Sequence, residues 1–180
     1  MIFIRADYCD ENVLDVILVA LMPANRLAII TSLTTGLRIG DVLALRTECL
    51  KKERFTIKEE KTGKSRRVRL NSELRKQLFA QAGRYYVFEH RNDPMRHRTR
   101  QAINKDLKRA CELFRVKGVT ISPHTARKIY AVKQYKTYNL THVKKLLNHS
   151  SEAVTQIYAL ADEITKKNNK NRLVSVPEIK

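Results

Sequence analysis

Cysteine is scarce in this chain of 180 residues, which has only Cys9, Cys49 and Cys111. The three are far apart and form no Cys-x-x-Cys pair, which argues against a disulfide framework or a zinc site and favours a reducing, cytoplasmic compartment. Long apolar runs are also lacking, since no stretch approaches the roughly 20 residues that span a bilayer. The sequence has neither a glycine-rich phosphate loop nor an acidic cluster suited to magnesium.

Acidic residues are half as frequent as basic ones. The chain has 18 Asp and Glu against 36 Lys and Arg, a formal net charge of +18. Hydrophobic residues make up 43% of it, so a chain of this length is expected to fold as one domain with a sizeable core. The positive charge favours a polyanionic partner, with nucleic acid as the first candidate. A basic protein that is merely soluble is the alternative.

Periodicity and turn residues predict a mainly helical domain with a small antiparallel sheet. Helices are expected at residues 10–22, 25–35, 41–46, 72–82, 99–116, 124–137, 140–148 and 151–158. Alternation at residues 55–57 and 68–70 predicts a β-hairpin, with further short strands near residues 47–50 and 86–88. Residues 89–98 are predicted to form a polar loop, Gly36 is expected to end the second helix, and Gly118 is expected to end the helix at 99–116.

The turn of the predicted hairpin, Lys61-Thr62-Gly63-Lys64, is strongly basic. A solvated turn is the simpler interpretation. The functional one is a finger that enters the DNA minor groove and donates a proton to a leaving 5′ oxygen. Lysine suits that role because neighbouring cations and burial can lower its pKa. Lys61 and Lys64 both fit by position, and the other expected DNA contacts on the hairpin are Lys58, Arg66 and Arg67.

Two arginines are candidates for holding a phosphate. Arg38 follows a bend marked by glycine, and Arg127 lies one helical turn after His124, behind a proline that suits a helix start. Two guanidinium groups can grip both non-bridging oxygens of a phosphate and stabilise the added charge of its transition state. Alternatively, Arg38 pairs with Asp41 on the surface, and the His-x-x-Arg motif arises by chance.

Tyr158 lies nine residues after His149. This spacing fits a tyrosine nucleophile delivered to a phosphate that a histidine helps to hold. Phenol has a reference pKa near 10, so it needs nearby cations and a base, which the two arginines and His124 could supply. A core tyrosine among apolar neighbours is the alternative.

Taken together, these segments resemble the tyrosine recombinases, or phage integrases. The resemblance covers roughly residues 20–160 and rests on Thr35-Gly36-Leu37-Arg38-Ile39-Gly40-Asp41, Lys61-Thr62-Gly63-Lys64, His124-x-x-Arg127, and Leu147-Asn148-His149-Ser150-Ser151 followed by Tyr158. It favours Lys61 over Lys64 as the acid, and Asp41 matches an acidic position of the family. Where members usually have glycine before the second histidine, this chain has Asn148. The resemblance assigns catalytic roles to Arg38, Lys61, His124, Arg127, His149 and Tyr158.

The resemblance implies an α+β tyrosine-recombinase catalytic domain at residues 1–161 and a polar tail at 162–180 that docks on a neighbouring protomer. It implies site-specific cleavage and rejoining of double-stranded DNA through a 3′-phosphotyrosyl link, by a tetramer on DNA, without metal or nucleotide cofactor, in a prokaryote or phage. A non-catalytic accessory factor and a type IB topoisomerase are the alternatives. Members usually carry an N-terminal helical domain that clamps the other face of the DNA. This chain begins too late for such a domain, so it is expected to be either a catalytic fragment or a naturally short member.

Overall fold

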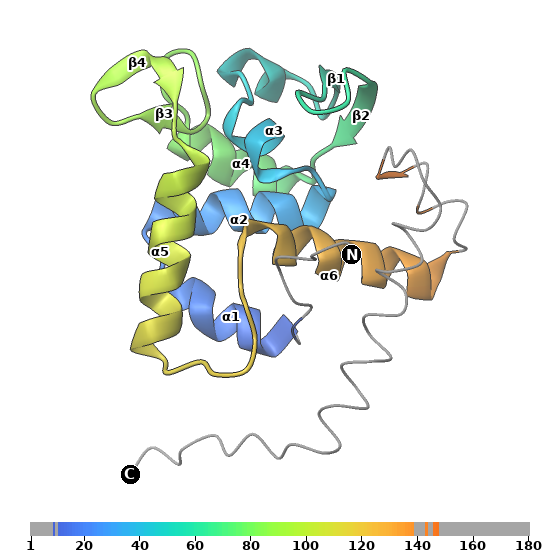
Figure 1. Cartoon of the computed structure of the whole chain (residues 1–180). Helices are drawn as coiled ribbons and strands as arrows, with labels where there is room; N and C mark the ends of the chain where they lie inside the picture. Colours follow the sequence, from blue (N-terminus) through green and yellow to red (C-terminus); the bar gives the residue numbers. More distant parts are fainter. Residues whose placement is uncertain (1–8, 10, 139–142, 144–145, 148–180) are drawn as a thin grey trace.

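The computed structural model describes residue 9, residues 11–138, and residues 143, 146 and 147. These form a mainly helical fold with antiparallel strands, as predicted, although the strands make two small sheets where one was expected (Figure 1). The elements are α1 Glu11–Val19, α2 Pro23–Thr35, α3 Ile39–Leu43, the 3-10 helix η1 Thr47–Lys51, β1 Arg54–Lys58, β2 Ser65–Arg69, α4 Ser72–Gln81, β3 Glu89–His90, β4 Asp93–His97, α5 Arg100–Leu113 and α6 Pro123–Thr137.

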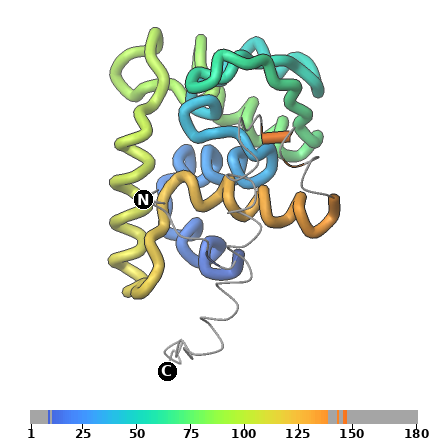
Figure 2. The backbone as a smooth tube through the Cα atoms, turned by 45° about the vertical axis from the view of Figure 1, so that its right-hand side comes forward, coloured from blue at the N-terminus to red at the C-terminus, as the bar shows by residue number. Residues whose placement is uncertain are grey.

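Helix α2 lies at the centre and contacts α3, α4 and α6. Helix α5 runs along one side, where it packs against α1 and α6, and both hairpins lie at the same end of the molecule (Figure 1). Helix α6 crosses α2, as Figure 2 shows from a second direction. The core between these helices is apolar, and its largest fully buried side chains include Leu14, Ile29, Leu43, Phe88 and Leu107. None of the described helices is long and apolar enough to cross a membrane.

The start of α2 is held by a carboxylate on α5. Asp106 accepts hydrogen bonds from the backbone N–H of Met22 at 2.9 Å and from Asn25 Nδ2 at 2.8 Å. Burial raises the pKa of Asp106, but the bonds from Asn25 and Arg109 outweigh it, so the pKa lies below its usual range. A negative charge is favourable at a helix N-terminus. The helix begins at Pro23 instead of residue 25, because proline fits the first helical position.

The end of α2 sets the direction of the chain toward the site. Gly36 has φ +67° and donates its N–H to the carbonyl of Ser32 at 2.8 Å, which ends the helix as predicted. A non-glycine residue rarely adopts this backbone conformation. The bend brings Arg38 to the position just before α3.

The β1–β2 hairpin is confirmed, with Phe55 opposite Val68, Ile57 opposite Arg66, and Thr56 opposite Arg67. The strand expected near residues 47–50 is wrong. That segment is the 3-10 helix η1, whose Leu50 is buried. The strand expected at residues 86–88 is reduced to an isolated antiparallel bridge between Tyr86 and Arg46.

Other boundaries also differ from the prediction, since α1 ends at Val19 and not at residue 22, and α3 spans Ile39–Leu43 and not residues 41–46. The loop expected at residues 89–98 contains the β3–β4 hairpin, where Pro94 is tolerated because every strand of a two-stranded sheet is an edge. Helix α5 ends at Leu113, before residue 116, because Arg115 takes a positive φ of 50°, and Gly118 lies further on. Apart from residues 143, 146 and 147, the helices expected at 140–148 and 151–158 and the tail at 162–180 fall outside the described residues.

Candidate active site

The end of α2 and the first turns of α6 meet around the carbonyl oxygen of Gly36. Arg127 lies on α6, donates its Nη1 to this oxygen at 2.6 Å, and donates its Nη2 to the carbonyl of Leu147 at 2.7 Å. Its side chain is buried. The tertiary contact between α2 and α6 therefore brings Arg127 to the bend that carries Arg38.

The start of α6 orients the His-x-x-Arg motif. Ser122 is the N-cap, and its hydroxyl accepts from the N–H of His124 at 3.2 Å. Thr125 returns the interaction by accepting the N–H of Ser122 at 3.1 Å, which completes a capping box. Pro123 occupies the first helical turn, so His124 lies in that turn and Arg127 one turn later, as the sequence predicts.

Arg38 forms an ion pair that the sequence did not suggest. Its Nη1 donates to Glu59 Oε2 at 2.7 Å, and the Arg38 side chain is 18% exposed. The alternative pairing with Asp41 is therefore wrong. The residue that pairs with Arg38 lies 21 positions further on, just after β1, and only the packing of the hairpin against the α2–α3 bend brings the two together.

Asp41 holds the hairpin instead. Its Oδ1 accepts from the backbone N–H of Glu60 at 2.9 Å, while its buried Oδ2 has no hydrogen-bond partner among the described residues. Burial and the nearby charge of Glu59 raise the pKa of Asp41 above its usual value, against the lowering effect of the Glu60 bond and of Arg38 and Arg127. The acidic position of the motif thus tethers the β1–β2 turn to α3.

Four cations, Arg127, Lys61, Arg38 and Lys128, lie near enough to His124 for their charges to affect its pKa. Loss of solvation lowers this pKa most, and the four charges lower it further. His124 is nevertheless exposed to solvent in the described part of the chain. The structure thus brings together four of the predicted site residues, from α6, the hairpin turn and the α2–α3 bend. A depressed pKa favours the neutral imidazole, which can accept a proton.

The hairpin carries most of its predicted basic residues on the surface. Lys58, Lys64 and Arg67 are exposed. Arg66 differs, because it is buried and donates Nη2 to the carbonyl of Thr35 at 2.6 Å and Nη1 to that of Gly36 at 3.2 Å. Its geometry assigns it to joining the hairpin to the end of α2 instead of contacting DNA.

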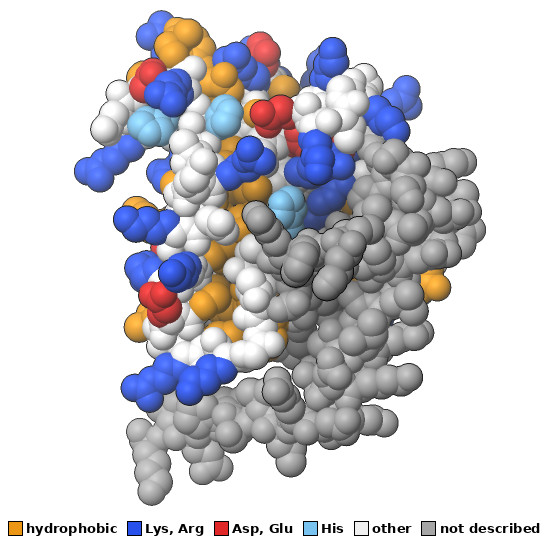
Figure 3. All heavy atoms as spheres, viewed as in Figure 1, with side chains coloured by type: hydrophobic (Ala, Val, Ile, Leu, Met, Phe, Trp, Pro, Cys, Tyr) orange, Lys and Arg blue, Asp and Glu red, His pale blue; other side chains and the backbone are white. Residues whose placement is uncertain are grey.

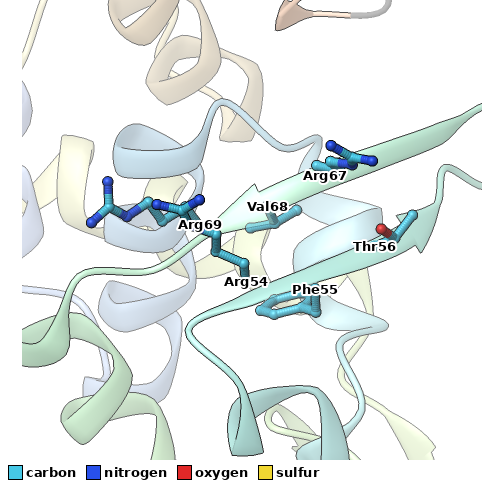
Figure 4. Close-up of a pocket in the computed structure, with 6 residues that line it drawn as sticks. All are labelled: Arg54, Phe55, Thr56, Arg67, Val68 and Arg69. Atoms are coloured by element: carbon cyan, nitrogen blue, oxygen red, sulfur yellow. The ribbon is translucent and has the colours of Figure 1, made fainter.

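The open face of the hairpin adds two arginines that the sequence analysis missed. Arg54 lies directly opposite Arg69, beside Thr56 and Arg67, and these residues line a shallow hollow (Figure 4). Arg69 pairs with Glu53 at 2.6 Å. Lys and Arg side chains gather around this end of the molecule (Figure 3). Strand alternation was the signal for both, because every second residue from Arg54 and Arg67 faces the same side.

His149 and Tyr158 lie outside the described residues. Glu59 is a third residue that the sequence analysis missed. Glu59 is 1% exposed, with its carboxylate bonded to Arg38, Thr62 and Arg66. It continues the inward face of Phe55 and Ile57 at a spacing of two residues. That alternation could have indicated its burial, although not its partners.

This fold is that of tyrosine-recombinase catalytic domains, and the comparisons with known proteins agree. The chain matches the Phage integrase family over residues 9–163 and belongs to that family. A curated relative, the probable integrase/recombinase YoeC of Bacillus subtilis (strain 168), is 26% identical over 146 residues, which cover 77% of this chain and 78% of the relative.

Two solved structures show the same fold. The crystal structure of XerA recombinase superposes with a TM-score of 0.68 at 19% identity and covers 95% of this chain and 65% of that one. A lambda integrase dimer bound to a COC′ core site gives 0.72 at 17% identity and covers 88% of this chain and 60% of that one. The present chain therefore spans less than two thirds of either structure.

Proposed function

We propose that this chain is a site-specific DNA recombinase that cleaves and rejoins strands of double-stranded DNA through a 3′-phosphotyrosyl intermediate. Membership of the Phage integrase family supports the proposal. So does the similarity in fold to lambda integrase, which was solved as a dimer on a COC′ core site and as a tetramer on a Holliday junction. By the same argument, the working form of this chain is a tetramer on DNA.

The observation that carries the proposal is the convergence of Arg38, Lys61, His124 and Arg127 from three separate parts of the sequence. These three cations around one imidazole suit a phosphodiester, whose transition state gains negative charge. Arginine is the residue best suited to hold two phosphate oxygens at once. The exposed basic residues of the hairpin extend this positive surface along the DNA backbone.

In the proposed reaction, Tyr158 Oη attacks the scissile phosphorus while the bond from phosphorus to the 5′ oxygen breaks. The phenolic proton passes to neutral His124, and Lys61 gives a proton to the departing 5′ oxygen. Arg38, Arg127 and His149 hold the non-bridging oxygens. A 5′ hydroxyl of the partner strand then attacks the phosphotyrosine in the reverse sense and releases Tyr158. The phosphoryl link is conserved, so the proposal includes no nucleotide cofactor.

The test is a nicked suicide substrate that traps the covalent intermediate. The wild type should form an adduct with DNA that survives denaturant, with a chelator present throughout. Tyr158→Phe keeps the ring but removes the attacking oxygen, so it should bind DNA and form no adduct. Tyr135→Phe, which alters an exposed tyrosine of α6, is the matched control and should form the adduct normally. An adduct with Tyr158→Phe would contradict the assignment.

Recombination differs from two related activities in its products. An accessory DNA-binding factor would bind and form no adduct, and a type IB topoisomerase would relax supercoiled plasmid without exchanging strands. Incubation with supercoiled plasmid and with paired attachment sites separates the three. Strand exchange between the paired sites is the outcome that we expect.

A further inference from the structure

Glu59 is an almost fully buried carboxylate that joins segments carrying site residues, and the chemistry above gives it no part. Its Oε2 accepts hydrogen bonds from Arg38 Nη1 at 2.7 Å and from Thr62 Oγ1 at 2.8 Å. Its Oε1 accepts a longer one from Arg66 Nη1 at 3.4 Å. One oxygen is therefore shared between the proposed phosphate-binding arginine and a hydroxyl in the hairpin turn.

The backbone of the hairpin turn is closed on the same residue. The N–H of Glu59 donates to the carbonyl of Lys64 at 3.0 Å, and the N–H of Gly63 donates to the carbonyl of Glu59 at 2.8 Å. The N–H of Lys64 also points to Thr62 Oγ1, at 3.4 Å. Lys61 lies within this turn, next to Thr62, and its side chain is exposed. The backbone position of Lys61 thus follows from bonds that Glu59 and Thr62 make.

The charge of Glu59 is maintained by these contacts. Burial of a carboxylate is costly unless donors and cations compensate it. Burial raises the pKa of Glu59, but the hydrogen bonds from Thr62 and Arg38 and the charges of Arg38 and Arg127 outweigh it, and the pKa lies below its usual value. Glu59 is therefore ionised at neutral pH and holds Arg38 and Thr62 with the same oxygen.

We infer that Glu59 is a positioning residue, which fixes Lys61 relative to the phosphate by sharing its Oε2 between Arg38 and Thr62. The inference rests on the proposed function, in which Arg38 holds the scissile phosphate and Lys61 protonates the leaving 5′ oxygen. A merely structural carboxylate would slow cleavage of every substrate alike. Loss of the bond between Thr62 and Glu59, which leaves the bond to Arg38 in place, should matter only where the leaving group needs a proton.

The variant Thr62→Val tests this link most gently, because valine has nearly the shape of threonine but lacks the hydroxyl. Thr62→Ser restores the hydroxyl. Thr34→Val is the matched control, since the hydroxyl of this exposed threonine donates to the carbonyl of Ile30 within its own helix and makes no other hydrogen bond among the described residues. Glu59→Gln keeps the shape of the acid, removes its charge, and is measured in the same assays.

Two DNA substrates separate positioning from general damage. On ordinary DNA, Thr62→Val should form the adduct about ten- to a hundredfold more slowly, a part of what a positioned acid contributes. On DNA with sulfur as the 5′ bridging atom, the leaving group needs no proton, so the rate should return to within about twofold of the wild type. Thr62→Ser and Thr34→Val should match the wild type on both. Equal slowing on both substrates, or normal cleavage of ordinary DNA, would overturn the inference.

Limited proteolysis tests the anchoring of the hairpin turn without a measurement of DNA cleavage. Trypsin should cut after Lys61 and Lys64 about tenfold faster in folded Thr62→Val and Glu59→Gln, because local opening becomes easier. Thr34→Val should be cut at the wild-type rate. Failure of the wild type to form an adduct on either substrate would instead count against the proposed function. In that case proteolysis alone tests the role of Glu59. Unchanged cutting of both Thr62→Val and Glu59→Gln would overturn its role in anchoring the turn, and faster cutting would support that role.

Discussion

Arg127 Nη1 donates a hydrogen bond of 2.6 Å to the carbonyl oxygen of Gly36, the residue that ends α2. Arg66 Nη1 approaches the same oxygen at 3.2 Å. A single backbone carbonyl therefore joins α6 to the β1–β2 hairpin at the bend that leads to Arg38. The geometry of the site depends on this bend as much as on the charged side chains around it.

Gly36→Ala should destabilise the protein more than the same change at another glycine. A methyl group at Gly36 would overlap the Tyr130 ring, and φ is +67°, so we expect a loss of about 2–5 kcal/mol from backbone strain and overpacking together. Gly63→Ala is the control, because its φ is +64° but nothing lies near the added carbon. It should lose only about 1–2 kcal/mol. Urea unfolding measures both, and equal losses would contradict the crowding at Gly36.

Arg66 and Arg67 are neighbours in the chain, but substitution of Arg66 should reduce stability and substitution of Arg67 should weaken DNA binding. Arg66→Met removes donors to buried carbonyls and should lower the free energy of unfolding by about 1–3 kcal/mol. Arg67→Met should change stability by less than about 0.5 kcal/mol, because this residue is exposed. In DNA binding, Arg67→Met should reduce the log-log salt slope by about 0.9 if it contacts one phosphate. An unchanged slope for Arg67→Met, or a reduced one for Arg66→Met, would reverse these roles.

His124 should give the protein a pH dependence in the weakly acidic range. Its pKa is lowered by burial and by Arg127, Lys61 and Arg38, so the unfolded chain takes up a proton at a higher pH than the folded one. The stability that His124 contributes is present above about pH 6.5 and is lost as pH falls from there to the lowered pKa. His124→Gln should therefore lose less stability than the wild type between pH 7.5 and 5.5. Parallel stability curves for the two proteins would contradict the shift.

The same shift predicts the pH dependence of cleavage. If neutral His124 accepts the phenolic proton, cleavage should decline on the acidic side with a midpoint below about pH 6.5. Single-turnover adduct formation measures this limb directly. A midpoint above that value would indicate that a different group acts as the base.

Asp41 should tolerate the loss of its charge better than the loss of its oxygen. Its pKa is raised, mainly by burial, so the ionised form is less favourable in the folded protein than in the unfolded chain. Asp41→Asn keeps an acceptor for the Glu60 N–H and should be at least as stable as the wild type at pH 7. Asp41→Ala loses the hydrogen bond of 2.9 Å and should cost about 1–2 kcal/mol. Thermal unfolding of both variants tests this, and a large loss with asparagine would mean that the charge stabilises the fold.

The sequence by itself determined the family and much of the local structure. The order and spacing of Arg38, Lys61 and the His124-x-x-Arg127 motif indicated a tyrosine recombinase, and the family match over residues 9–163 confirmed it. The bend at Gly36 and the start of α6 at Pro123 were also predictable, because glycine and proline restrict or permit particular backbone angles at those positions. Such features depend on a few consecutive residues.

Only the tertiary structure decided which charged groups face one another. Arg38 pairs with Glu59 and not with the nearby Asp41, and Arg66 turns inward although its neighbour Arg67 is exposed. The β3–β4 hairpin also formed where the polar sequence predicted a loop. The reason is that a charged side chain is buried only where packing brings partners to it, and the partners closest in space, Glu59 for Arg38 and the carbonyls of Thr35 and Gly36 for Arg66, lie 21 to 31 residues away in the chain. Local sequence patterns cannot predict contacts between residues that lie so far apart in the chain.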